Sequence, residues 1–137
     1  MYSNKISLRV RYAETDQMGY VYYGNYAQYY EVGRVELLRS IGVSYKSLEE
    51  MGYELPVVNF SINYLKPAHY DDNLILKTSL MGIPTSKIVF YFECFNTKKE
   101  LLNKGEVTLV FVNNKTKKPS KPPKIIIDTL NNFLQSI

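Results

Sequence analysis

Residues 14–34, ETDQMGYVYYGNYAQYYEVGR, decide how the rest of the chain is interpreted. The stretch begins with polar residues and the acid Asp16, passes Gly19 and several tyrosines, and reaches Asn25, where a helical pattern starts. Asn25 suits an N-cap, and Gln28 follows three residues later as a capping-box partner. The start of a helix carries unpaired N–H groups and a partial positive charge, which favour developing negative charge. The stretch therefore predicts a loop that delivers a carboxylate to an anion-stabilising helix end.

The hydrophobic period changes across this loop. Residues 5–12, KISLRVRY, alternate apolar and polar side chains, which predicts a half-buried strand. Beyond the loop the period becomes helical and lasts until Gly42, a C-cap candidate. A glycine inside a helix costs about 1 kcal/mol relative to alanine, so Gly33 predicts close packing against a sheet. The expected buried stripe comprises Tyr26, Tyr30, Gly33, Leu37 and Ile41, with Glu31, Arg34 and Arg39 largely off it.

The second half of the chain is rich in strand patterns. A short helix is predicted over 44–51, with Ser44 as its N-cap. Four strand patterns follow in the ranges 54–65, 72–83, 87–95 and 105–114. The last three are joined by short connections and predict an antiparallel meander, because parallel pairs need long crossovers. Residues 124–135 fit either a closing helix or an extended strand.

One long amphipathic helix needs an apolar surface that covers its stripe. A curved antiparallel sheet wrapped around it is the economical solution, so we expect an α+β fold in a single domain, 1–137. Such a sheet leaves edge strands, and pairing between two copies would cover one of them. The segment 54–64 is the candidate edge, and a homodimer is the smallest assembly expected.

Composition excludes several classes of protein. With 45% hydrophobic and 22% charged residues in 137, the chain has the balance of an ordinary soluble globular protein. Its apolar runs are too short to span a membrane, and residues 1–10 lack the apolar region of a signal peptide. The one cysteine, Cys94, forms no disulfide within the chain, so a cytoplasmic location is expected.

Common catalytic arrangements are missing from the sequence. A Ser-His-Asp or Cys-His pair would have to use the one histidine, His69, which lies in a turn pattern far from any Gly-x-Ser-x-Gly elbow. Cys94 falls inside a strand pattern, where it is expected in the core. No cluster has metal-ligand spacing, and no glycine-rich phosphate loop is present.

Positive charge is concentrated late in the chain. The formal net charge is +4, and five lysines crowd into the short range 115–124. This placement favours a local anion contact over a broad basic face, with a solvated loop as the alternative. A phosphate-bearing small molecule is therefore a plausible ligand class.

Three motifs give the chain a resemblance to a known family. They are ETDQMGYVYYGNY at 14–26, E-x-x-R at Glu31 and Arg34, and YLKPAHYDDNL at 64–74. Together they resemble the hotdog-fold acyl-CoA thioesterases, in the branch of 4-hydroxybenzoyl-CoA thioesterase and the YbgC-type enzymes. The resemblance extends from the strand 5–12 to about Pro123. It implies a five-stranded antiparallel sheet around a long central helix and hydrolysis of acyl-CoA to a free acid and CoA.

The resemblance also implies roles for individual residues. Asp16 matches the acid that acts as nucleophile or as base for water, and both routes stay open. Tyr23 falls where a backbone N–H polarises the thioester carbonyl, at a position that is histidine in many YbgC-type proteins. The N–H groups near Tyr23 to Asn25 are the expected oxyanion donors. Glu14 replaces a more usual aspartate.

Substrate contacts are implied in two segments. Near the helix start they are Tyr22, Gly24, Asn25 and Tyr26, and the tyrosines including Tyr30 are candidates to line an acyl pocket. For Tyr26 and Tyr30 a place in the helix core is the alternative. Ser86, Lys87, Lys117, Lys118 and Lys121 are the candidates for contact with the nucleotide or pantetheine portion of CoA. A dimer or tetramer with a site shared between subunits, no metal and no bound cofactor are implied as well, and no nucleic-acid partner is expected.

Other functions remain possible on the same scaffold. An acyl-carrier-protein thioesterase would use the same chemistry on a protein-borne thioester, and the basic surface suits an acidic carrier. A non-catalytic binder of CoA or nucleic acid is the alternative from a different class, with a steep salt dependence in the nucleic-acid case. A hydratase is disfavoured because its Asp/His pairing has no fitting histidine in this sequence.

Overall fold

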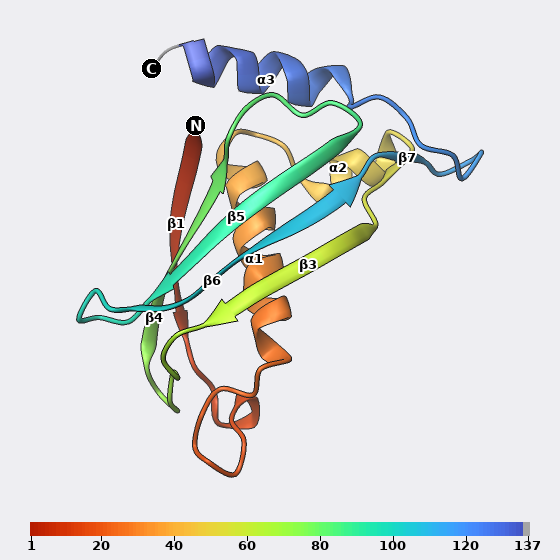
Figure 1. The fold of residues 1–137 in the computed structure, drawn as a ribbon. Helices are drawn as coiled ribbons and strands as arrows, with labels where there is room; N and C mark the ends of the chain where they lie inside the picture. Colours follow the sequence, from red (N-terminus) through yellow and green to blue (C-terminus); the bar gives the residue numbers. More distant parts are fainter. Residues whose placement is uncertain (136–137) are drawn as a thin grey trace.

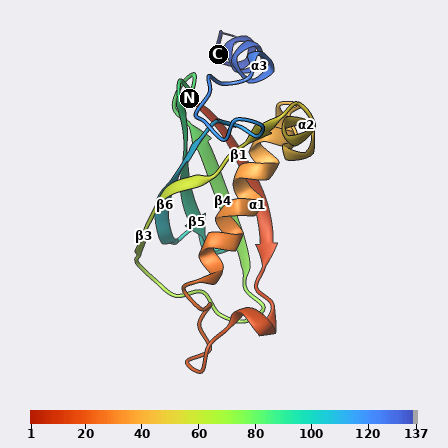
Figure 2. The same ribbon diagram turned by 90° about the vertical axis from the view of Figure 1, so that its right-hand side faces the viewer.

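One antiparallel sheet packs against one long helix in the computed structural model, which describes residues 1–135. The helix α1 (Asn25–Ser40) lies along one face of the sheet (Figures 1 and 2). The strand order is β1-β4-β5-β6-β3. This arrangement confirms the expected α+β class and the five-stranded antiparallel sheet. The strands are β1 (Tyr2–Arg9), β3 (Val57–Tyr64), β4 (Asn73–Leu80), β5 (Lys87–Phe95) and β6 (Leu101–Val110).

Shorter elements cover the ends of this sheet. The 3₁₀ turn η1 (Tyr12–Glu14) follows β1, and α2 (Tyr45–Glu50) is capped by Ser44 as predicted. The two-residue strands β2 (Tyr53–Glu54) and β7 (Val112–Asn113) pair with each other. The last element is the helix α3 (Lys124–Gln135), which lies across one end of the sheet in Figure 1. The open choice for 124–135 is therefore settled as a helix.

The apolar stripe of α1 explains its close approach to the sheet. Its members are buried as predicted, and Gly33 faces β4. A Cβ at Gly33 would lie 2.6 Å from Thr78 Oγ1 and 2.7 Å from Leu76 Cδ2, which is closer than real Cβ contacts allow. The prediction for Gly33 is confirmed, because any side chain there would push the helix off the sheet.

Two expectations about α1 are wrong. Arg34 is buried, because its Nε donates a 2.9 Å hydrogen bond to the hydroxyl of Tyr45 on α2, a partner that helical periodicity cannot show. Asn25 is the first helical residue and not the cap, which is Gly24 without a side-chain cap bond. The reason is a competing acceptor: Asn25 Nδ2 donates instead to the Glu14 carbonyl at 2.8 Å. The loop and the helix are tied together by this bond.

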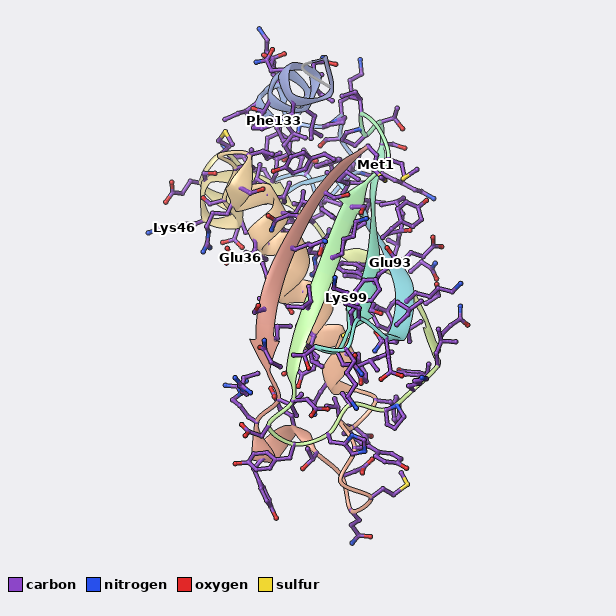
Figure 3. The ribbon with its side chains drawn as sticks, turned by 90° about the vertical axis from the view of Figure 1, so that its left-hand side faces the viewer. Met1, Glu36, Lys46, Glu93, Lys99 and Phe133 are labelled. Carbon is purple, nitrogen blue, oxygen red and sulfur yellow. The ribbon has the colours of Figure 1, made fainter. Side chains whose placement is uncertain are left out.

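The two faces of the sheet differ in character. Along β5, buried Ile88, Phe90 and Phe92 alternate with more exposed residues. Figure 3 shows Glu93 projecting from the sheet on the side away from Glu36 of α1. The face beneath α1 thus carries the core.

One edge of the sheet is open to solvent. β3 pairs only with β6, and nearly all its residues are exposed, large apolar side chains among them. The prediction that 54–64 contains an edge strand is confirmed. No helix within the described residues is long and apolar enough to cross a bilayer.

Candidate active site

A tight loop between η1 and α1 carries the predicted acid. Thr15 and Val21 form a bridge, and the Asp16 N–H donates to the Tyr20 carbonyl at 2.8 Å. Gly19 closes the turn at φ +78°, a left-handed conformation that glycine adopts without a steric penalty. The loop is therefore a small closed structure held by backbone hydrogen bonds.

The Asp16 carboxylate has one engaged oxygen and one open oxygen. Oδ1 accepts hydrogen bonds from the backbone N–H of Met18 at 2.9 Å and of Tyr20 at 3.2 Å. Oδ2 makes no hydrogen bond or ion pair within residues 1–135. The side chain is thus oriented through one oxygen, while the other can accept a proton or attack a carbon.

The start of α1 offers two unpaired donors. The backbone N–H groups of Tyr23 and Gly24 make no hydrogen bond within the described residues. The N–H of Asn25, also expected as a donor, already bonds to the Tyr22 carbonyl at 2.9 Å. Of the backbone N–H groups predicted as oxyanion donors, those of Tyr23 and Gly24 are therefore unpaired, and that of Asn25 is not. Tyr23 and Gly24 form the helix entrance, where the positive end of the helix dipole lies.

A groove of about 310 Å³ brings Asp16 and Tyr23 together. Tyr26 lines the same groove although it is only 3% exposed, so it belongs to the helix core and to the groove at once. Tyr30 is fully buried and belongs to the core alone. The other lining residues are Met18, Tyr20, Val21, Tyr64, Leu65, Lys66 and Pro67.

Phenol groups give this groove its chemical character. Burial raises the pKa of Tyr26 far above its ordinary value, and burial raises that of Tyr64 too. Both side chains therefore remain neutral at physiological pH. The Tyr64 hydroxyl donates to the Tyr23 carbonyl at 3.4 Å, which connects β3 to the helix entrance.

Comparison with known proteins gives this arrangement a family. The model of the Thioesterase-like superfamily matches residues 10–130, which include the whole loop, α1 and the sheet from β3 to β6. The chain belongs to this superfamily. Membership confirms the resemblance seen in the sequence motifs and the hotdog fold, and it identifies the chain as a thioester hydrolase.

Individual relatives agree over most of their length. The chain is 37% identical over 119 residues to YneP of Bacillus subtilis, provisionally named an acyl-CoA thioesterase, covering 87% of this chain and 86% of that protein. It is 33% identical over 120 residues to the acyl-CoA thioester hydrolase YbgC of Escherichia coli, covering 88% and 90%. The crystal structure of DHNA-CoA thioesterase from Staphylococcus aureus matches with a TM-score of 0.90 and 32% identity, covering 99% and 93%.

Not every residue predicted at the helix entrance lines the groove. Tyr22 is exposed, and its ring lies 4.8 Å from that of Tyr23, outside the groove. Gly24 and Asn25 are not among the residues that line the groove either. Gly24 and Asn25 instead belong to the backbone next to the unpaired Tyr23 N–H.

The predicted CoA contacts lie at the opposite end of the sheet. Figure 1 shows the loop before α1 at one end and the segments around the start of β5 and after β7 at the other. There Ser86 and Lys121 line one hollow of about 580 Å³, and Lys87 is exposed at the first position of β5. Lys118 is exposed, whereas Lys117 Nζ donates to Glu54 Oε1 at 2.6 Å. Within one chain these residues are not brought together with Asp16.

Other reactive side chains have structural roles. His69 lies exposed in the turn before β4, as predicted, and its backbone N–H donates to Asp72 Oδ2 at 2.8 Å. Cys94 is buried, as predicted, and burial raises the pKa of its thiol to about 12, so it stays protonated. Within the described part of the chain, no group of three His, Cys, Asp or Glu side chains could hold a metal ion.

Sequence reasoning missed the side of the groove formed by the end of β3 and the residues after it, which are Tyr64, Leu65, Lys66 and Pro67. Tyr64 and Leu65 reach it from the end of β3, about forty residues after the loop. The signal was present in the motif at 64–74, but nothing in its spacing shows that it closes onto residues 16–23. Glu14 was also left without a role, because its spacing from Asp16 does not show what its side chain contacts.

Proposed function

We propose that this protein hydrolyses acyl-CoA thioesters to a free acid and CoA. The observation that carries the proposal is that one groove is lined both by Asp16, whose Oδ2 has no hydrogen-bond partner within residues 1–135, and by Tyr23, whose backbone N–H is unpaired there. Thioester hydrolysis passes through an oxyanion, and a donor at the developing charge lowers the barrier. The names of the relatives support acyl-CoA as the substrate class.

Asp16 supplies the second half of this chemistry by one of two routes. As a general base, its Oδ2 takes a proton from water while the water oxygen bonds to the thioester carbon, and the carbon–sulfur bond then breaks with the proton going to the thiolate. As a nucleophile, Oδ2 bonds to the same carbon, CoA leaves as a thiolate, and water hydrolyses the resulting anhydride. A single turnover in ¹⁸O-water separates them, because only the anhydride route can place ¹⁸O in the Asp16 carboxylate.

The shape and lining of the groove bear on the acyl group. Its walls are mainly tyrosine rings and aliphatic side chains, and aromatic pairs are favoured in tilted and edge arrangements. The centre of the Tyr26 ring lies 5.7 Å from that of Tyr64 at an interplanar angle of 57°, so neutral phenols already pack there in a tilted arrangement. An aromatic acyl group suits such walls, and the similar protein from Staphylococcus aureus is named for a DHNA thioester. We therefore propose an aromatic acyl group over a long aliphatic one.

The site is proposed to be completed by a second copy of the chain. β3 begins shortly after β2, which pairs with β7 just before the lysine-rich segment 115–124. We call this end of the sheet the lysine end. β3 finishes at Tyr64, which contacts the helix entrance. Pairing two β3 edges antiparallel would place the lysine end of one copy beside the Asp16 end of the other. Lys87, Lys121 and Ser86 of one copy would then serve the phosphates of a CoA whose acyl group lies in the other copy's groove. A solution mass of two or four chains is expected.

The experiment that tests the function is a hydrolysis panel. Native protein and Asp16→Asn are assayed with aromatic, short aliphatic and long aliphatic acyl-CoA esters, and with acyl-carrier-protein esters. We expect fastest turnover of aromatic acyl-CoA and a loss in Asp16→Asn of more than about 10²-fold in kcat, the low end of general acid–base effects. The melting temperature serves as the control for folding.

Each outcome of this panel has a meaning. Equal rates in both proteins would eliminate the role of Asp16. Turnover of carrier-protein esters alone would replace CoA by a protein-borne substrate. Binding of CoA without hydrolysis of any ester would make the protein a binder, and salt-dependent binding of an oligonucleotide would extend that reading to nucleic acid.

A further inference from the structure

Glu14 is a buried acid outside the groove, two residues before Asp16. It is only 7% exposed, and its carboxylate has a full set of partners. Oε1 accepts hydrogen bonds from the backbone N–H of Arg11 and from the Tyr29 hydroxyl, each at 2.8 Å. Oε2 accepts from the Arg11 guanidinium at 2.8 and 3.3 Å. One side chain therefore links Arg11, two residues after β1, to the second turn of α1.

The backbone carbonyl of Glu14 holds the helix entrance. It accepts the N–H of Tyr22 and the side-chain Nδ2 of Asn25, both at 2.8 Å. These two residues flank Tyr23 and Gly24, whose N–H groups are unpaired. The direction in which those N–H groups point is therefore fixed from both sides by one carbonyl oxygen.

The same residue lies at the base of the loop that carries Asp16. The Glu14 N–H donates to the Arg11 carbonyl at 2.9 Å, and Thr15 next to it forms the bridge with Val21. Only Thr15 separates Glu14 from Asp16 in the sequence. Displacement of Glu14 would therefore move the acid and the oxyanion donors together.

We propose that Glu14 is a positioning residue that clamps the Asp16 loop and the Tyr23 N–H into one geometry. The inference rests on the proposed thioesterase function, since it explains how the two reacting groups keep their relative place. Glu14 does not line the groove, so it acts through its carbonyl and its ties to Arg11 and Tyr29. Misplacement of catalytic groups by about 1 Å can cost about 10²-fold in rate, so such a clamp matters for turnover.

The charge of Glu14 is part of the clamp. Burial alone would raise the pKa of the carboxyl, but hydrogen bonds from Arg11 and Tyr29 outweigh burial and hold it below its ordinary value. The side-chain hydrogen bond to Glu14 also raises the pKa of the Arg11 guanidinium, because it stabilises the charged form. Arg11 and Tyr29 are the titratable groups that face this carboxylate. Glu14 is therefore ionised at neutral pH, and its four hydrogen bonds are charge-assisted.

Three variants test the clamp at different strengths. Glu14→Ala removes all its side-chain bonds, Glu14→Gln keeps the shape without the charge, and Tyr29→Phe removes one bond without touching Glu14. Glu36→Gln is the matched control, because Glu36 forms the same kind of Glu–Arg pair, three residues apart with Arg39, elsewhere on α1. Each protein is studied by amide hydrogen exchange over residues 15–25 and by kcat and KM with the best ester of the panel.

We expect the exchange of the Tyr22 and Asp16 amides to rise by about tenfold or more in Glu14→Ala, with smaller rises in Glu14→Gln and Tyr29→Phe. kcat should fall in the same order, by about 10- to 100-fold in Glu14→Ala, while KM stays within about twofold. Glu36→Gln should change neither. A purely structural role would instead lower the active fraction and the melting temperature, with kcat per active site unchanged.

Two results would overturn the proposal. Unchanged exchange over 15–25 in Glu14→Ala would show that Glu14 does not hold the loop. Faster exchange with unaltered kcat would show that the loop position does not govern turnover. If the native protein hydrolyses no thioester, the proposed function fails, and exchange alone still decides whether Glu14 clamps the loop.

Discussion

The two ends of the sheet are built in different ways. At the Asp16 end, backbone hydrogen bonds at 2.8–3.2 Å fix the acid and the helix entrance. At the other end, Ser86 and Lys121 sit among prolines, and the lysines are exposed. The Asp16 end therefore holds its polar atoms in fixed positions, whereas the lysine end carries exposed positive charge. Bond cleavage needs fixed atoms, whereas holding phosphates in solution needs mainly positive charge nearby.

This contrast predicts how substitutions divide between rate and affinity. Changes at the Asp16 end should appear in kcat, because in the proposed mechanism they affect groups that act only as the oxyanion forms. Changes at the lysine end should appear in KM, because in the proposed complex the lysines contact the part of CoA that does not react.

The largest effect is expected on removing one N–H. Replacing Tyr23 by its α-hydroxy acid turns the amide into an ester and deletes the donor while keeping the side chain. We expect kcat to fall by about 10²- to 10³-fold, the usual cost of one oxyanion donor. The measurement is single-turnover hydrolysis of an acyl-CoA ester.

The matched control for this change is Tyr23→Phe. It keeps the N–H and removes only the hydroxyl, so kcat should stay within about threefold of the native value. A large loss in Tyr23→Phe with little loss in the ester protein would reverse the assignment and make the phenol the donor. An effect of the ester on KM alone would break the contrast between the two ends.

The second effect is expected at the lysine end. Lys87→Ala combined with Lys121→Ala should raise KM for acyl-CoA about tenfold at low salt, since exposed charge pairs are each worth up to about 1 kcal/mol. The rise should shrink with added salt while kcat stays unchanged. Lys46→Ala on α2 serves as the control for lost positive charge, because Lys46 lies away from the hollow lined by Lys121. A change in kcat equal to that in KM would count against the division.

The proposed sharing of one site between two copies of the chain can be tested with the same proteins. Asp16→Asn and the double lysine variant are unfolded, mixed in equal amounts and refolded together. Half of the resulting dimers then contain one chain of each variant. In each such dimer, one of the two sites combines a native Asp16 with native lysines from the other chain. About 25% of native activity should therefore return at subsaturating substrate. Activity no higher than the average of the two separate variants would show that each chain builds its site alone.

The sequence predicted the Asp16 end better than the lysine end, for physical reasons. Loop, acid and helix start are neighbours in the chain, so turn residues and helical periodicity locate them. The helix cap was missed because Asn25 turned to the Glu14 carbonyl, an acceptor eleven residues away. Arg34 was missed in the same way, since its partner Tyr45 lies on the next helix. Local patterns describe an element well and its partners poorly.

Contacts across the fold were beyond the sequence. Tyr64 joins the groove only because β3 is the last strand of the sheet, and strand order is not written in any local pattern. The lysines were grouped by their closeness in sequence, yet the structure separates them by what they contact. A run of charged residues indicates which region of the surface is positive. The role of each lysine in that region depends on the groups that its side chain contacts.

A smaller effect is expected in the pH dependence of stability at the Asp16 end. The pKa of Glu14 is lowered in the folded chain, so its stabilising contribution is present above its ordinary value of 4.5 and is lost as pH falls through the folded value. The melting temperature of the native protein should therefore drop more steeply below that pH than that of Glu14→Gln. Glu100→Gln is the control, because Glu100 also has a lowered pKa, through Lys66, but is paired at the surface. Parallel acid curves for native protein and Glu14→Gln would contradict the lowered pKa.

The smallest effect is expected for Lys117, and it sharpens the account of the lysine end. Lys117 Nζ is paired with Glu54 Oε1 at 2.6 Å, and its backbone is in a left-handed turn at φ +59°. A lysine whose charge is already matched contributes less to phosphate binding than Lys121, for which no carboxylate partner is found within residues 1–135. Lys117→Ala should therefore change KM by less than about twofold, as surface pairs usually do. Glu54→Ala, which releases the same lysine, should instead lower KM slightly, and a rise in KM would show that the pair itself shapes the CoA contact.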